Sequence, residues 1–121
     1  MNPIPKAMTT IYHNPRCGTS RSALQLLQDR GMAVDVIEYL HTPLSRSQLA
    51  ALIRDAGITP REAIRSKETL FQELKLDGPE VTDDQLLDAM AEHPILMNRP
   101  FVVTDKGTRL CRPATVLEEI L

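Results

Sequence analysis

The sequence predicts an α/β fold in which a four-stranded mixed sheet is interrupted by a block of helices. Strand, helix and strand patterns follow one another near the N-terminus, and a hairpin followed by a helix pattern closes the chain. Between them lie three separate helix-start signals. With 121 residues and 42 % hydrophobic content, the chain suits one domain with a modest core, which we place at residues 8–121.

The first three predicted elements form a strand–helix–strand unit. Residues 8–12 are rich in β-branched and aromatic side chains, as strands are. Residues 20–30 carry apolar side chains at helical spacing before Gly31, a typical helix stop. Residues 33–39 alternate in polarity and form the second strand. A helical crossover of this kind makes the two strands parallel.

The middle of the chain, at about residues 45–93, is predicted to be a helical insertion. Capping boxes satisfy the first N–H groups of a helix reciprocally and therefore mark helix starts. Three pairs of residues have the required spacing: Ser45 with Gln48, Thr59 with Glu62, and Thr82 with Gln85. Gly78 and Pro79 separate a helix at 68–75 from one at 83–93.

The C-terminal part predicts a hairpin, with strands at 101–104 and 108–112, and a last helix at 114–120. The complete order of elements is the thioredoxin-like plan with an insertion between strands two and three. In that plan, the start of the first helix faces the loop before the hairpin. We predict a cis Arg99–Pro100 bond in this loop, which would aim Arg99 at Cys17.

Composition excludes several classes of function. A net charge of −2 argues against a nucleic-acid binder with a basic face. No apolar run approaches the ~18 residues of a membrane span, and residues 1–7 lack a signal-peptide core. We expect a cytoplasmic protein with a disordered leader at 1–7 and no membrane partner. The two cysteines and three histidines are isolated from one another, so no metal site is expected.

Cys17 is the candidate nucleophile, because it stands where a strand gives way to a helix. Unpaired N–H groups and the helix dipole stabilise a thiolate there. Gly18 allows close backbone approach, and the hydroxyls of Thr19 and Ser20 are expected to bond the sulfur or an anion. Asn14 precedes a proline, so the chain before Cys17 is expected to be extended.

Two further residues have alternative interpretations. His13 is either a satisfied histidine at a strand end or a group that lowers the pKa of Cys17. Cys111 is expected to be a buried structural residue, because neighbours in a strand point to opposite faces and Arg112 is expected to face Cys17. Ser20 stands three positions after Cys17, so no CxxC disulfide forms and an external thiol must resolve any intermediate.

Three segments together carry a family resemblance: residues 12–21, 94–100 and 107–113. They resemble the glutathione/glutaredoxin-coupled arsenate reductase family over nearly the whole chain after Met8. The resemblance implies a thioredoxin-like fold with a helical insertion and Cys17 as nucleophile. It further implies that His13 and Ser20 tune the thiolate. The residues that it places around an oxyanion are Arg65, Arg99 and Arg112.

The chemistry implied by this resemblance is reduction of arsenate, or a similar oxyanion, to arsenite. Glutathione would be the co-substrate and glutaredoxin the protein partner, without a metal or a tightly bound cofactor. Two alternatives share the fold. One is a redox-sensing regulator of the Spx type that binds RNA polymerase, although Ser20 replaces the second cysteine usual there. The other is a glutathione-dependent thiol transferase, for which three arginines would be superfluous.

Overall fold

A computed structural model describes residues 9–121, which form two compact units. The first unit combines the N-terminal part up to Glu38 with Arg99–Leu121, and the second is Tyr39–Asn98. The expected leader at residues 1–7, and Met8 of the first predicted strand, lie outside the described residues.

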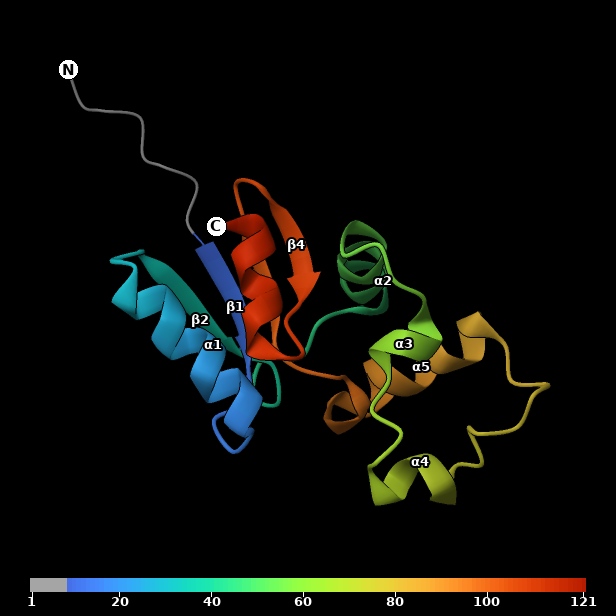
Figure 1. Ribbon diagram of the computed structural model, residues 1–121. Helices are drawn as coiled ribbons and strands as arrows, with labels where there is room; N and C mark the ends of the chain where they lie inside the picture. The colour runs from blue at the N-terminus through green and yellow to red at the C-terminus, as the bar shows by residue number, and fades with distance from the viewer. Residues whose placement is uncertain (1–8) are drawn as a thin grey trace. The chain divides into compact units, whose positions relative to one another are not determined.

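The first unit contains the predicted four-stranded mixed sheet (Figure 1). Its strands, in chain order, are β1 (Thr9–His13), β2 (Val34–Glu38), β3 (Phe101–Thr104) and β4 (Gly107–Leu110). Their order across the sheet is β2-β1-β3-β4. β1 pairs with β2 in parallel, while β1–β3 and β3–β4 are antiparallel. The predicted fold class and the parallel crossover are therefore confirmed.

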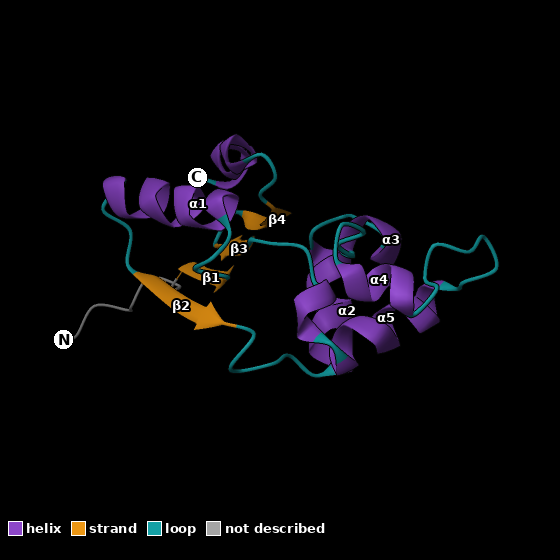
Figure 2. Ribbon diagram, turned by 90° about the horizontal axis from the view of Figure 1, so that it is seen from below, coloured by secondary structure: helices purple, strands orange, loops and turns teal. Residues whose placement is uncertain are grey.

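Two helices cover one face of this sheet: α1 (Gly18–Asp29) and η2 (Ala114–Ile120), the latter a 3₁₀-helix (Figure 2). Apolar side chains from the sheet and both helices form the core between them: Ile11, Ala23, Leu27, Val102, Cys111, Leu117 and Ile120. Helix α1 begins two residues before the predicted start at Ser20. Cys17 is consequently the residue immediately before the helix, its N-cap.

The second unit is helical. It comprises α2 (Arg46–Asp55), α3 (Pro60–Ala63), α4 (Thr69–Glu73), α5 (Asp83–Glu92) and the 3₁₀-helix η1 (Pro94–Leu96). All three predicted capping boxes form, with both reciprocal hydrogen bonds in each. Helix α4 is shorter than the predicted 68–75. Its last turn ends at Leu74, and Lys75 follows with a positive φ of 55°.

The hairpin ends carry two cis proline bonds. Arg99–Pro100 is cis, as predicted, and Arg112–Pro113 is also cis, which the sequence analysis did not predict. Beyond the last paired residues of β3 and β4, the Cys111 N–H donates to the Pro100 carbonyl over 2.8 Å. The pairing therefore continues past the strand ends and holds the two proline-containing segments together.

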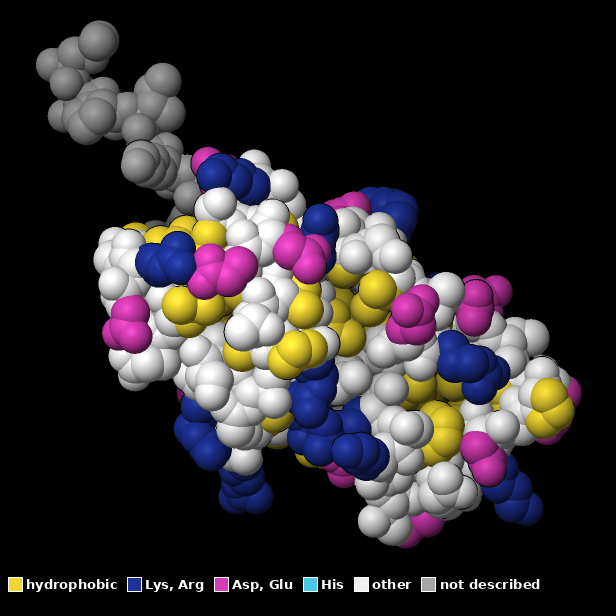
Figure 3. Space-filling view, in the orientation of Figure 1, with side chains coloured by type: hydrophobic (Ala, Val, Ile, Leu, Met, Phe, Trp, Pro, Cys, Tyr) yellow, Lys and Arg dark blue, Asp and Glu magenta, His cyan; other side chains and the backbone are white. Residues whose placement is uncertain are grey.

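Several charged side chains on the surface form ion pairs. Within the first unit, Arg30 pairs with Glu118, and within the second, Arg46 contacts both Asp84 and Asp88. Some positive and negative side chains are in contact on the face shown in Figure 3, while other Lys and Arg side chains lie apart from any acidic group. Exposed pairs of this kind contribute little to stability, typically below about 1 kcal/mol each. Within residues 9–121, no helix has the length and apolar character needed to cross a bilayer.

Candidate active site

A tight turn connects β1 to α1 and places Cys17. The Asn14 carbonyl accepts from the Cys17 N–H over 3.0 Å, and the Asn14 side-chain Oδ1 accepts from the Arg16 N–H over the same distance. Asn14 is itself buried. The expectation of an extended segment before Cys17 is therefore wrong. An asparagine side chain supplies the acceptor that closes such turns, and proline is favoured at the second position of a turn, which Pro15 occupies.

The Cys17 sulfur faces the unpaired amides of the first turn of α1. Burial raises the pKa of the Cys17 thiol, but the N–H groups of Ser20 and Thr19 and the Arg112 guanidinium together lower it further than burial raises it. The net result is a pKa below the ordinary value for a cysteine. The Cys17 residue is partly exposed to solvent. Cys17 is therefore an activated thiol that a small substrate can reach.

Arg112 supplies the cationic partner of the sulfur. Its Nη1 lies 3.4 Å from Cys17 Sγ and also donates to the Arg99 carbonyl over 2.8 Å. One guanidinium nitrogen thus bridges the thiolate and the loop before β3. Arg99 is 94 % buried. A cation held by a main-chain carbonyl loses little freedom when an anion binds beside it.

His13 and Ser20 form a buried polar contact behind the turn. Their Nδ1 and Oγ atoms are 2.6 Å apart, and the Asn14 N–H donates to the same hydroxyl over 3.1 Å. Burial lowers the pKa of His13, the Glu38 carboxylate raises it, and Arg21 lowers it again, with a net decrease. A neutral ring protonated at Nε2 accepts the Ser20 hydroxyl proton at Nδ1. The hydroxyl is thus engaged by His13 and Asn14, and it is the Ser20 backbone N–H that faces the sulfur.

Cys111 lies in the core of the first unit and is fully buried. Burial raises the pKa of its thiol to about 12, so it stays protonated at neutral pH. Arg112, the next residue, faces Cys17 instead. The predicted alternation of these two neighbours is confirmed.

Arg65 belongs to the second unit, directly after the segment that ends α3. Its Nε lies 3.2 Å from Glu68 Oε1, and its backbone N–H donates to the Leu96 carbonyl over 2.7 Å. The structure thus brings Cys17, Arg112 and the main chain of Arg99 together in the first unit. A role for Arg65 in binding an oxyanion stays a prediction.

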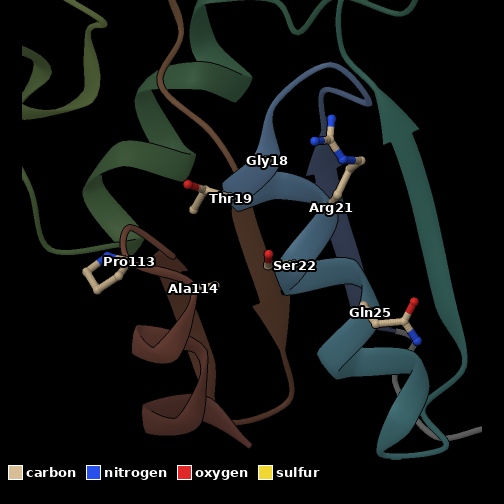
Figure 4. Close-up of a pocket in the computed structure, with 7 residues that line it drawn as sticks. All are labelled: Gly18, Thr19, Arg21, Ser22, Gln25, Pro113 and Ala114. Carbon is tan, nitrogen blue, oxygen red and sulfur yellow. The ribbon is translucent and has the colours of Figure 1, made fainter.

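An open groove runs along the first turns of α1, which directly follow Cys17 in the chain (Figure 4). It is lined by seven residues of the first unit: Gly18, Thr19, Arg21, Ser22, Gln25, Pro113 and Ala114. The sequence analysis did not predict it. The helical spacing of 18, 21, 22 and 25 indicates that these residues share one face, but nothing in the pattern shows that Pro113 borders that face.

The first unit is a thioredoxin-like domain whose single accessible cysteine lies between helix-start amides and an arginine, as suits a protein that handles an anion through a thiolate. The chain belongs to the ArsC family, whose model matches residues 12–120. An arsenate reductase of Rhizobium meliloti is 57 % identical over 112 residues, covering 93 % of this chain and 80 % of that protein.

Two further comparisons agree. An arsenate reductase of Escherichia coli strain K12 is 51 % identical over 112 residues, covering 93 % of this chain and 79 % of that protein. A solved structure of an arsenate reductase from Vibrio cholerae superposes with a TM-score of 0.91 at 42 % identity. It covers 97 % of this chain and all of that chain. The likeness thus extends over fold and sequence together.

Proposed function

We propose that this protein is an oxidoreductase that reduces arsenate to arsenite through a covalent adduct on Cys17, with glutathione as co-substrate and glutaredoxin as protein partner. The observation that carries the proposal is the position of the Cys17 sulfur between the first-turn amides of α1 and the Arg112 guanidinium. The names of the relatives add the identity of the oxyanion. The expected compartment is the cytoplasm, where both cysteines stay reduced.

The site must hold a dianion beside an anionic nucleophile. At an effective dielectric near 20, unit charges about 4 Å apart repel by about 4 kcal/mol, so an uncompensated pair would bind poorly. Charge-assisted hydrogen bonds contribute roughly 1.5–3 kcal/mol each. Arg112, Arg99 and Arg65 are proposed to supply them, together with the amides of α1. Two or three such bonds are sufficient to offset the repulsion.

Chemically, the Cys17 thiolate attacks arsenic, and one arsenate oxygen leaves as water after protonation. The product is a thioester of As(V). A first external thiol replaces a second oxygen, again released as water. A second external thiol then attacks the sulfur of the first. A disulfide forms, the arsenic–sulfur electron pair stays on arsenic, and As(V) becomes As(III). Hydrolysis of the remaining bond to Cys17 frees arsenite and restores the thiol.

The electrons must come from outside the chain. Of the two cysteines in the sequence, Cys111 is buried in the core with a raised pKa, and Ser20 occupies the position where a CxxC motif would carry a second thiol. Two external thiols per arsenate therefore fit the site better than an internal disulfide. Glutathione and glutaredoxin are proposed for these two steps.

The test is a coupled assay in which the protein, glutathione, glutaredoxin, glutathione reductase and NADPH are mixed and arsenate is added. The expected result is NADPH oxidation that depends on arsenate and on Cys17, while phosphate causes none. A Cys17→Ser variant should be inactive. Absence of oxidation that depends on arsenate, with all partners shown to be active, would overturn the proposal.

A further inference from the structure

The groove that begins at Gly18 plays no part in the reaction described above. Residues at positions 18, 21, 22 and 25 form its long side on α1, and the start of η2 forms the opposite rim. In Figure 4 the side chain of Thr19 points toward the Pro113 side, and that of Arg21 extends away from it toward the preceding turn. The groove therefore has a neutral side and a cationic side.

We propose that this groove binds the first external thiol, and that the ligand is a small thiol carrying a carboxylate on a peptide-like backbone. This inference rests on the proposed function and names the place where its thiol co-substrate is held. Gly18 and Thr19 line the groove and directly follow Cys17. The Thr19 N–H is also one of the donors to the Cys17 sulfur, so a ligand at this end of the groove lies close to the sulfur that carries arsenic.

The charge of the lining selects an anionic ligand. Among the seven lining residues, Arg21 alone is charged, and it is exposed. Its Nη1 donates to the Pro15 carbonyl over 2.9 Å, which fixes the guanidinium beside the groove. A guanidinium has five N–H donors in a fork that matches a carboxylate. Arg21 is therefore placed to hold a carboxylate at the groove's edge.

The remaining lining suits the amides of a short peptide. Thr19 and Ser22 offer hydroxyls, and Gln25 offers an amide whose Nε2 donates to Asp29 over 2.9 Å. Gly18 contributes no side chain. A Cβ built there would lie 3.7 Å from Arg21 Nη2, an ordinary contact distance, so the Arg21 guanidinium lies beside Gly18.

Binding matters because the thiol has to meet a transient adduct. A thiol held against α1 reacts with the arsenic as an effectively unimolecular step. In that step one S–As bond forms, one As–O bond breaks, and the oxygen leaves as water with the thiol proton. No electrons are transferred until a second thiol attacks. The groove therefore acts on the first thiol step alone.

The experiment compares two substitutions of the same exposed residue. Ser22→Glu places a carboxylate in the groove, whereas Ser22→Gln adds similar bulk without charge. Both are tolerated on an exposed helix face. Ser22→Glu should raise the KM for glutathione about fivefold to tenfold, because like charges meet at a partly solvated site. The KM for arsenate should not change, and Ser22→Gln, which loses the hydroxyl but keeps a neutral hydrogen-bonding group, should raise the KM for glutathione less than Ser22→Glu does.

Two controls sharpen the comparison. Gln28→Glu adds the same charge on an exposed position of α1 outside the groove and should leave the KM for glutathione unchanged. With 2-mercaptoethanol, an uncharged thiol, Ser22→Glu should behave as the wild type. An unchanged KM for glutathione in Ser22→Glu, or an equal increase in Gln28→Glu, would overturn the proposal.

A binding measurement separates this inference from the proposed activity. In the Cys17→Ser variant, which cannot form the adduct, glutathione should shift the amide NMR resonances of Thr19, Ser22 and Gln25 in a saturable manner. S-methylglutathione should do the same, and 2-mercaptoethanol should not. Saturable shifts without arsenate turnover in the wild type would refute the activity and support the groove. Turnover without such shifts would refute the groove alone.

Discussion

Arg112 and Cys17 are 95 positions apart in the sequence, yet Arg112 Nη1 lies 3.4 Å from the Cys17 sulfur. The same nitrogen donates to the Arg99 carbonyl. The end of the C-terminal hairpin therefore lies beside the start of α1. The Arg112 guanidinium contacts both the Cys17 sulfur and the segment before β3. Reactivity of the thiol consequently depends on how the hairpin is closed as well as on the helix that follows Cys17.

Replacing Arg112 should make Cys17 less reactive at neutral pH. An Arg112→Gln variant loses both the hydrogen bond and the positive charge that lower the thiol pKa, so the pKa should increase. The measurement is the rate of Cys17 alkylation by iodoacetamide as a function of pH, with Cys111→Ala as background. Arg109→Gln is the matched control, because Arg109 pairs with Glu119 on the surface. Equal midpoints in all three proteins would contradict the assignment.

The two thiols should differ sharply in labelling. Native protein should take up one iodoacetamide per chain, at Cys17, because burial raises the pKa of Cys111 to about 12 and shields it from the reagent. Unfolding in urea should expose both. Mass spectrometry of the labelled peptides gives the answer. A Cys111→Ala variant should retain arsenate turnover, and a loss as complete as that of Cys17→Ser would show that Cys111 takes part.

His13 should make the protein less stable in mild acid. Its pKa in the folded state lies below its ordinary value of 6.5, chiefly because of burial. The unfolded chain therefore binds the proton more readily, and the contribution is fully present above about pH 6.5 and lost as pH decreases through the folded pKa. Urea unfolding between about pH 7.5 and pH 5 should show this decrease, and His13→Asn should reduce it. An identical pH slope in the variant would contradict the interpretation.

Arg99→Lys should weaken the use of arsenate while preserving charge. An ammonium cannot reproduce the bidentate geometry of a guanidinium, so the KM for arsenate should increase about tenfold, the equivalent of one charge-assisted hydrogen bond. The KM for glutathione serves as the internal control and should stay constant. An unchanged KM for arsenate would place the Arg99 side chain outside the substrate site.

Loss of one helix cap in the second unit should reduce stability by a predictable amount. Thr82 accepts from the Gln85 N–H and completes a capping box at the start of α5. Thr82→Ala should lower the free energy of unfolding by about 1 kcal/mol, whereas Thr82→Ser should retain most of it. Chemical denaturation measures both. Similar losses in the two variants would indicate that the methyl group, and not the hydroxyl, is responsible.

Local signals made most of the fold predictable. Each capping box needs two side chains three residues apart, and all three formed at the expected positions. The order of strands and helices then determined the sheet. The start of α1, which has no capping box, was predicted less accurately. Gly18 gives no cap signal, so α1 was expected to begin at Ser20.

The site was predictable only in part, because its geometry depends on long-range contacts. The position of Cys17 before a helix follows from sequence, but its contact with Arg112 depends on the hairpin. Asn14 was missed as the residue that closes the turn, although asparagine before a turn is a known signal. The hydroxyl of Ser20 was expected to bond the sulfur or an anion, yet a histidine seven positions earlier engages it. Spacing alone does not show which of two acceptors a hydroxyl will choose.

The neighbours Cys111 and Arg112 point in opposite directions at the end of a hairpin whose pairing continues to Pro100. A one-residue slip of that hairpin would exchange them, bringing a second sulfur to the first and burying a guanidinium among aliphatic side chains. Burying that charge is energetically unfavourable, and this disfavours the slipped register. Hairpin register therefore decides whether Arg112 or a second cysteine lies beside Cys17, and so whether an internal disulfide could form.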